Sequence, residues 1–159
     1  MSRDFYISFI EPYSPIIIKI CRAYTDTEQD FEDYYQEVCL QIWRSRDSFH
    51  EHAKWSTWIY RLSLNVCLTL LKKEKNNKDK HLAYNPTEHL ADSNAFENED
   101  LNLLYSAIKK LKEIDRAVIL LYLEEKSYQE IADILGTKPN NIGVRINRIK
   151  DKLKKILNG

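Results

Sequence analysis

The chain has 159 residues, of which 43% are hydrophobic and 30% charged, so it can form one small domain or two. With 3 Gly and 4 Pro it holds little material for the tight turns of a β protein, and its composition favours helices. The longest apolar run near its start, Ile16–Ile18, is far shorter than the ~20 residues of a membrane-spanning helix, and no signal peptide is recognisable. We therefore expect a cytoplasmic protein without membrane insertion.

Two helices are predicted in the first fifty residues. The first runs from about residue 4 to 23 and is bent or restarted near Pro12 and Pro15, because proline lacks the amide N–H of a helix interior. The second begins after Thr27, where acidic residues crowd its first turn, and ends at about Arg46. Apolar spacing predicts that Tyr35 is buried and that Tyr34 lies nearer the surface. The predicted buried stripe comprises Phe31, Tyr35, Val38 and Ile42.

The third predicted helix, from about residue 54 to 75, has two contrasting faces. One face combines an aromatic ring, an amide and cations, which is typical of a surface for single-stranded nucleic acid, where rings stack on bases. A solvated cationic face with a partly buried tryptophan explains the same pattern. This mixed face comprises Lys54, Trp58, Arg61, Asn65 and Lys72. The residues predicted to be core are Trp55, Ile59, Leu62, Val66 and Leu70, together with Trp43 of the second helix.

The segment from about Asn76 to Asp100 shows no sustained apolar periodicity and is interpreted as a linker between two helical domains. Residues 81–100 hold 5 acidic residues and no basic ones, whereas residues 101–159 hold 12 basic and 7 acidic residues. The net charge of +0 therefore averages a neutral part, an acidic linker and a basic part. Four helices are predicted after the linker, at about 100–111, 113–124, 128–135 and 139–157.

The last two of these helices carry the pattern of a helix-turn-helix. Ser127 and Glu130 fit a capping box, and Gly136 follows where the chain must turn, a position that favours positive φ. Pro139 lies in the first turn of the final helix, where its missing N–H is not needed. The predicted buried face of that helix comprises Ile142, Ile146, Ile149, Leu153 and Ile156.

The opposite side of the final helix is basic, since residues 138–159 hold 7 Lys and Arg against a single acid, Asp151. Asn and Arg can reach base edges in a major groove, while Lys mostly meets phosphates. A solvated basic face explains the charges alone, but beside the turn motif the pattern favours DNA binding. The predicted DNA contacts are Lys138, Asn140, Asn141, Arg145, Arg148 and Lys152.

Together these motifs resemble the extracytoplasmic-function (ECF) group of bacterial RNA polymerase sigma factors, in the sigma-70 family, over about residues 5–157. Residues 32–38 (EDYYQEV) resemble the family's acidic DxxQE helix, which implies that Asp33, Gln36 and Glu37 contact core RNA polymerase. Residues 55–61 (WSTWIYR), ending at Asn65, resemble the helix that melts and reads the −10 promoter element as single strand. Residues 127–136 (SYQEIADILG) and the helix after them resemble the domain that reads the −35 element as duplex.

This resemblance implies an all-α protein with a region 2-like domain over 1–76, a linker over 77–99 and a region 4-like helix-turn-helix domain over 100–159. The implied partners are core RNA polymerase, promoter DNA and an anti-sigma factor, and the acidic linker would pass through polymerase channels otherwise used by RNA. The chain departs from the family at Gly143, where many members carry a basic residue and where glycine costs a helix roughly 1 kcal/mol against alanine.

Two other classes of protein are alternatives. A stand-alone helix-turn-helix regulator explains the last thirty residues but not the acidic helix or the mixed face, and such regulators usually dimerise. An enzyme is disfavoured, because no phosphate-binding glycine loop occurs and Cys21, Cys39 and Cys67 are too far apart for metal-ligand spacing. We expect these cysteines to be reduced, half-buried thiols and His50 and His52 to lie in a loop. No catalytic residue, metal or cofactor is predicted.

Overall fold

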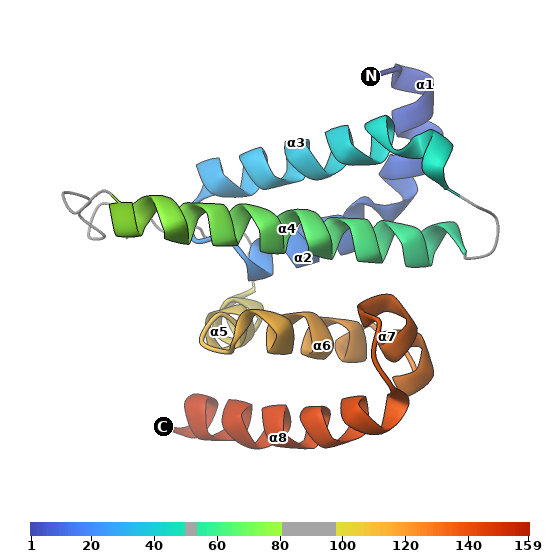
Figure 1. The fold of residues 1–159 in the computed structure, drawn as a ribbon. Helices are drawn as coiled ribbons and strands as arrows, with labels where there is room; N and C mark the ends of the chain where they lie inside the picture. The colour runs from blue at the N-terminus through green and yellow to red at the C-terminus, as the bar shows by residue number, and fades with distance from the viewer. Residues whose placement is uncertain (50–53, 81–97) are drawn as a thin grey trace. The chain divides into compact units, whose positions relative to one another are not determined.

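Helices and turns make up the computed structural model over the residues that it describes, which are 1–49, 54–80 and 98–159. The chain divides into two compact units, Met1–Ser93 (unit 1) and Asn94–Gly159 (unit 2), and each has a buried core of its own (Figure 1). This confirms the predicted all-α, two-domain architecture. The linker predicted over 77–99 falls largely outside the described residues, as do His50 and His52, and the predicted domain bounds stay a prediction.

The N-terminal segment is a series of short helical pieces, as its prolines predict. Helix α1 (Arg3–Phe5) leads through a π-helical turn (Tyr6–Ile10) and a 3-10 turn (Glu11–Tyr13) into α2 (Ser14–Ala23). Pro12 lies in the 3-10 turn and Pro15 in the first turn of α2, so neither removes an amide that a helix interior needs. The restart turns the apolar side of α2 inwards, where it buries Ile16, Ile17, Ile20, Cys21 and Ala23.

Helix α3 (Glu28–Arg44) begins where the sequence predicts, with Thr27 as its N-cap, and the Thr27 hydroxyl accepts a hydrogen bond from the amide of Asp30 at 3.1 Å. A short 3-10 turn (Arg46–Ser48) follows it. The prediction for its tyrosines was wrong, because Tyr34 is 3% exposed while Tyr35 and Phe31 are half-buried. Tyr34 lies in the same row as Val38 and Ile42, four residues apart, and this row faces α2 and α4.

Helix α4 (Trp55–Lys80) extends past its predicted end and packs against both α2 and α3 (Figure 1). Its predicted core was largely wrong. Only Ile59 of that set is buried, whereas Trp55, Leu62, Val66 and Leu70 are half-buried. Because two helices contact α4 from adjacent sides, the buried face is rotated away from the predicted stripe. The buried residues of α4 are Ile59, Tyr60, Ser63, Leu64 and Cys67.

The cysteines lie in the core of unit 1, fully buried rather than half-buried as predicted. The Sγ atoms of Cys21 on α2 and Cys67 on α4 are 3.9 Å apart, within contact distance of each other. Burial raises the pKa of the Cys39 thiol from 9.0 to about 11, and the hydrogen bond to Cys21 together with burial raises the pKa of Cys67 well above its usual value. Cys39 and Cys67 are therefore poor nucleophiles in the folded protein.

Unit 2 consists of the predicted helices, α5 (Glu99–Ile108), α6 (Glu113–Leu123), α7 (Tyr128–Leu135) and α8 (Pro139–Asn158). Helix α8 contacts each of the other three helices, so its buried face contributes to the whole core of unit 2. The predicted face of α8 is confirmed, with Ile142, Ile146, Ile149 and Leu153 buried and Ile156 half-buried.

The turn between α7 and α8 has the geometry that its sequence predicts. Ser127 and Glu130 form a complete capping box, with hydrogen bonds of 3.1 and 3.2 Å between the side chain of one and the backbone amide of the other. Gly136 ends α7 at φ 73°, in the left-handed region that other residues avoid. Pro139 opens α8. The helix-turn-helix is thereby fixed by local interactions at both of its helix ends.

Candidate polymerase and nucleic-acid interfaces

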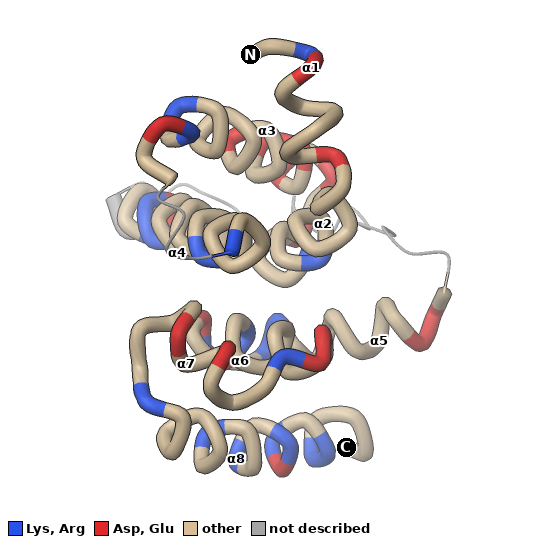
Figure 2. The backbone as a smooth tube through the Cα atoms, turned by 90° about the vertical axis from the view of Figure 1, so that its right-hand side faces the viewer, with Lys and Arg blue, Asp and Glu red and all other residues tan. Residues whose placement is uncertain are grey.

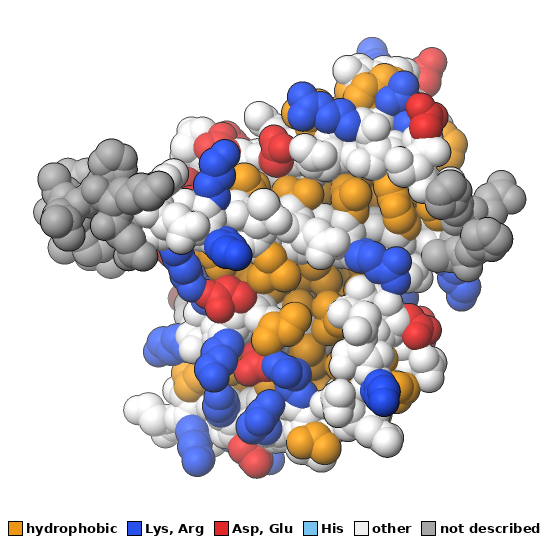
Figure 3. Space-filling view, in the orientation of Figure 1, with side chains coloured by type: hydrophobic (Ala, Val, Ile, Leu, Met, Phe, Trp, Pro, Cys, Tyr) orange, Lys and Arg blue, Asp and Glu red, His pale blue; other side chains and the backbone are white. Residues whose placement is uncertain are grey.

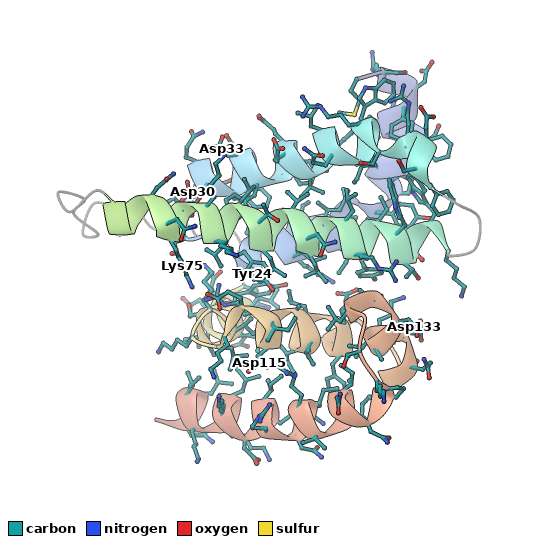
Figure 4. The ribbon with its side chains drawn as sticks, viewed as in Figure 1. Tyr24, Asp30, Asp33, Lys75, Asp115 and Asp133 are labelled. Carbon is teal, nitrogen blue, oxygen red and sulfur yellow. The ribbon has the colours of Figure 1, made fainter. Side chains whose placement is uncertain are left out.

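The acidic face of α3 comprises Asp33, Gln36 and Glu37, of which the first two are exposed and the third is half-buried (Figure 4, where Asp33 is labelled). The Gln29 side-chain amide donates to Asp33 at 3.1 Å, and the Gln41 amide donates to Glu37 at 2.9 Å. Each partner lies four residues away on the same helix. These bonds hold both carboxylates in place, so the face presents ordered negative charge suited to a basic partner.

The mixed face predicted on α4 is exposed along its length. Lys54, Arg61, Asn65 and Lys72 are exposed, and Trp58 is half-buried. At 1.5 Å per residue the face extends for about 27 Å, long enough to follow several nucleotides. Figure 2 shows Lys and Arg positions along α4, whereas the acidic positions of unit 1 are concentrated on α3 and its neighbours.

Trp58 belongs to an aromatic cluster that the sequence did not reveal. Its ring centroid lies 4.7 Å from that of Trp55 and 5.7 Å from that of Phe49. The Trp55 indole N–H donates to the Phe9 carbonyl at 2.9 Å, which ties α4 to the N-terminal turns. Trp43, edge-on to Phe5 at 5.1 Å, is half-buried, so neither Trp43 nor Trp55 is core as predicted.

Beside this cluster lies a cavity of about 430 Å³. Its lining is mostly aromatic and includes one basic and one acidic side chain, Arg46 and Asp47. Its aromatic walls can stack against a planar ring. Phe5 and Phe9 come from the N-terminal turns, far from the other lining residues in sequence. No local sequence motif could therefore have predicted that they line this cavity. The residues lining the cavity are Phe5, Phe9, Arg46, Asp47, Phe49 and Trp55.

The predicted DNA-contacting face of α8 is exposed except for one member. Lys138, Asn140, Asn141, Arg148 and Lys152 are exposed, and the Asn141 amide donates to the Thr137 hydroxyl at 3.3 Å. Figure 3 shows Lys and Arg side chains gathered over unit 2 on the face turned to the viewer, and Figure 2 shows several Lys and Arg positions along α8. This basic surface can attract a phosphate backbone.

Arg145, the half-buried member, has a partner inside unit 2. Its guanidinium donates to the carboxylate of Asp115 on α6 at 2.8 Å, and the Asp115 side chain is 4% exposed (Figure 4). A second tie joins the same helices, since the Lys150 ammonium donates to the Tyr122 hydroxyl at 2.7 Å, which raises the pKa of Lys150. Together these two interactions hold α8 against α6 and so help to fix the orientation of α8 within unit 2.

Gly143 has a packing role in the turn motif. A Cβ atom at this position would lie 3.3 Å from Cε2 of the Tyr128 ring, which rests against the helix there. Glycine thus allows the first residue of α7 to lie close to α8. A larger residue at position 143 would require the Tyr128 ring to shift slightly.

Within residues 1–49, 54–80 and 98–159, no helix is both long and apolar enough to cross a membrane. In the same residues no cluster of His, Cys, Asp and Glu side chains has the grouping of a metal site. The fold is that of a two-domain helical protein with a helix-turn-helix in its second domain.

Comparison with known proteins gives the family. The Sigma-70 region 2 model matches residues 9–77, and the Sigma-70, region 4 model matches residues 101–153. An ECF RNA polymerase sigma-E factor of Haemophilus influenzae is 30% identical over 142 residues, which are 80% of this chain and 75% of that protein. The ECF RNA polymerase sigma factor SigW of Bacillus subtilis is 29% identical over 168 residues, 98% of this chain and 90% of that protein.

Solved structures share the fold over nearly the whole chain. The sigma factor RpoE in complex with the anti-sigma factor NepR, from Bartonella quintana, matches with a TM-score of 0.79 at 19% identity, covering 99% of this chain and 98% of that one. CnrH in complex with the cytosolic domain of CnrY matches with a TM-score of 0.71 at 20% identity, covering 99% and 90%. The chain belongs to the ECF group of RNA polymerase sigma factors, in the sigma-70 family. It is a polymerase-binding initiation factor rather than a stand-alone regulator.

Proposed function

We propose that three chemically distinct faces divide the work of this sigma factor. The acidic face of α3 binds core RNA polymerase, the mixed face of α4 binds the opened −10 element, and the exposed face of α8 binds the −35 duplex. The observation that carries the proposal is the coexistence of these faces on exposed helix surfaces, since ordinary packing explains none of them. RNA synthesis itself belongs to the polymerase, and this chain contributes binding in the cytoplasm, where the polymerase acts.

The acidic face contacts polymerase through Asp33, Gln36 and Glu37. The carboxylates of Asp33 and Glu37 accept hydrogen bonds from neighbouring glutamines, so these two side chains lose little conformational entropy on binding. Opposite charge on the partner would steer association as well as stabilise the complex.

The mixed face binds single-stranded DNA through Trp58, with Lys54, Arg61, Asn65 and Lys72 along the backbone. The half-buried ring is braced by Trp55 and Phe49 and keeps part of its surface for a base to stack on. Bases of a duplex are stacked on one another, so this face favours the open state of the promoter.

The exposed face of α8 binds duplex DNA through Lys138, Asn140, Asn141, Arg148 and Lys152. Arg145 was predicted to join them, and its ion pair with Asp115 supports a second task for it, the positioning of α8. The acidic linker over 77–99 runs through polymerase channels that otherwise hold RNA. An anti-sigma factor is a further proposed partner. Of the two solved structures described above, RpoE is bound to the anti-sigma factor NepR, and CnrH is bound to the cytosolic domain of CnrY.

Run-off transcription tests the proposed function directly. Purified core polymerase transcribes fragmented genomic DNA with and without this chain, and the 5′ ends of new transcripts are mapped. We expect new transcripts that start downstream of a shared pair of sequence elements. Absence of new transcripts, together with absence of binding to core polymerase, would contradict the proposal.

A further inference from the structure

The exposed face of α8 carries an apolar side chain that packing does not explain. Val144 is 68% exposed, more than any other large hydrophobic side chain among the described residues. It lies in the second turn of α8, opposite the buried Ile142, Ile146 and Ile149. A β-branched residue gains nothing for helix stability at such a position. Its side chain is therefore available to a partner.

The neighbours of Val144 on this face are amides and a cation. At 100° per residue, Val144 and the residues three and four positions away from it occupy about a third of the helix circumference, with Val144 near the middle. They are Asn140, Asn141, Val144, Asn147 and Arg148, and all are exposed. Val144 and Asn147 are about 4.5 Å apart along the helix axis, comparable with the ~3.4 Å between successive base pairs. The two side chains can thus meet adjacent base pairs.

The chemistry of a major groove limits what Val144 can contact. A recognition helix places its N-terminal residues against base edges. Valine has no hydrogen-bonding group for a phosphate, and the C5-methyl of thymine is the apolar group on the base edges there. The amides beside it match the N6 and N7 pattern of adenine. With 7 cations and one acid over residues 138–159, the charge of the helix favours DNA over an apolar protein surface.

We propose that Val144 determines part of the −35 specificity by contacting a thymine methyl group, with Asn147 reading a neighbouring adenine. This inference rests on the proposed binding of duplex DNA by α8. Val144 would recognise an A·T pair through the methyl group of its thymine. It is not among the basic and amide residues of α8 proposed above to contact DNA.

Uracil substitution isolates the methyl group. Holoenzyme is assembled from core polymerase and the full chain, and the probe is a promoter fragment obtained from the run-off experiment. Each thymine of its upstream duplex element is replaced in turn by uracil, which pairs with adenine but lacks the methyl. We expect one substitution to weaken binding about fourfold, the effect of exposing one buried methyl-sized group. For Val144→Ala, thymine and uracil at that position should bind equally.

Matched variants give the controls. Val144→Ile should keep the sensitivity to uracil, and so should Leu157→Ala, which removes another exposed apolar side chain of α8. If no position is sensitive, or if Val144→Ala keeps the sensitivity, the inference is wrong. Arg148→Ala separates this failure from that of the proposed function. Weakened binding by Arg148→Ala, with no effect of any uracil substitution, overturns only the role of Val144. If Arg148→Ala also leaves binding unaltered, the proposed contact of Arg148 with duplex DNA fails as well.

Discussion

The carboxylate of Asp115 is buried in unit 2 with the Arg145 guanidinium 2.8 Å away. Because this carboxylate is almost fully buried, its partner matters more than the partner of an exposed carboxylate would. Arg145 itself is 35% exposed on its side chain, so water screens part of the interaction. The main effect of the pair on stability is therefore that it prevents an unpaired buried charge at Asp115.

Arg145→Met keeps the length of the side chain and removes its charge. We expect the free energy of unfolding of unit 2 to fall by about 1–3 kcal/mol, the cost of leaving a buried polar group without its partner. All three tryptophans, Trp43, Trp55 and Trp58, lie in unit 1. In urea unfolding, the far-UV circular dichroism transition should therefore shift while the tryptophan fluorescence transition stays. Lys152→Met, an exposed cation of the same helix, should change neither transition; equal effects of both variants would contradict the role of Arg145.

Tyr105 makes the stability of unit 2 depend on alkaline pH. Burial, with a smaller effect of the Glu124 charge, raises the pKa of Tyr105 from 10.0 to about 12. Because the folded pKa is the higher one, this stability is fully present below pH 10 and is lost as pH rises through 12. Tyr105→Phe should flatten the fall of the free energy of unfolding between pH 10 and 12, measured in urea at several pH values. Parallel curves for both proteins would show that Tyr105 does not titrate there.

At the scale of the element, α3 presents its carboxylates as one surface. Glu37→Lys reverses the charge of a half-buried member whose oxygen accepts from Gln41. We expect affinity for core polymerase to fall about tenfold or more, because a like charge would face the basic partner. Helicity should be unchanged, and Glu11→Lys, an exposed acid of unit 1 outside α3, should bind normally. Wild-type affinity of Glu37→Lys would remove α3 from the interface.

Helix α4 should act at a later step than α3. Trp58→Ala removes a stacking surface worth about 1–3 kcal/mol per base in single-strand binding. We expect promoter opening, followed by a fluorescent base in the −10 element, to be impaired while holoenzyme assembly is unaffected. Thr69→Ala, an exposed substitution on the same helix, serves as the control. A large loss of helicity instead would show that Trp58 mainly supports the aromatic cluster.

The helices of this chain were predictable to the extent that their signals are local. The capping box at Ser127, the turn at Gly136 and the proline restarts depend on residues within a few positions of one another. The buried side of α4 was not predictable, because it depends on where α2 and α3 lie. The ion pair of Asp115 was not predictable either, because it joins residues thirty positions apart. In the sequence, an acidic residue in the first turn of a helix indicates only where the helix begins.

At the scale of the whole molecule, the net charge of +0 conceals a basic unit that carries the face proposed to bind the −35 duplex. Phosphate contacts release counterions, so each lost contact lowers the salt dependence of binding. Arg148→Ala should weaken holoenzyme binding to promoter DNA and reduce the slope of log affinity against log salt by about 1. Titrations at several salt concentrations measure this slope. A slope equal to that of the wild type would place Arg148 outside the interface.

The division into two units with separate cores also bears on how promoter choice can change. The core of unit 2 is built from its own four helices, so substitutions on the exposed side of α8 leave the packing of unit 1 untouched. The surface proposed for polymerase docking lies on α3, in the other unit. A lineage, or an engineer, can therefore exchange unit 2 for that of another family member and change the −35 element that the same polymerase recognises, while the proposed −10 and polymerase surfaces of unit 1 stay as they are.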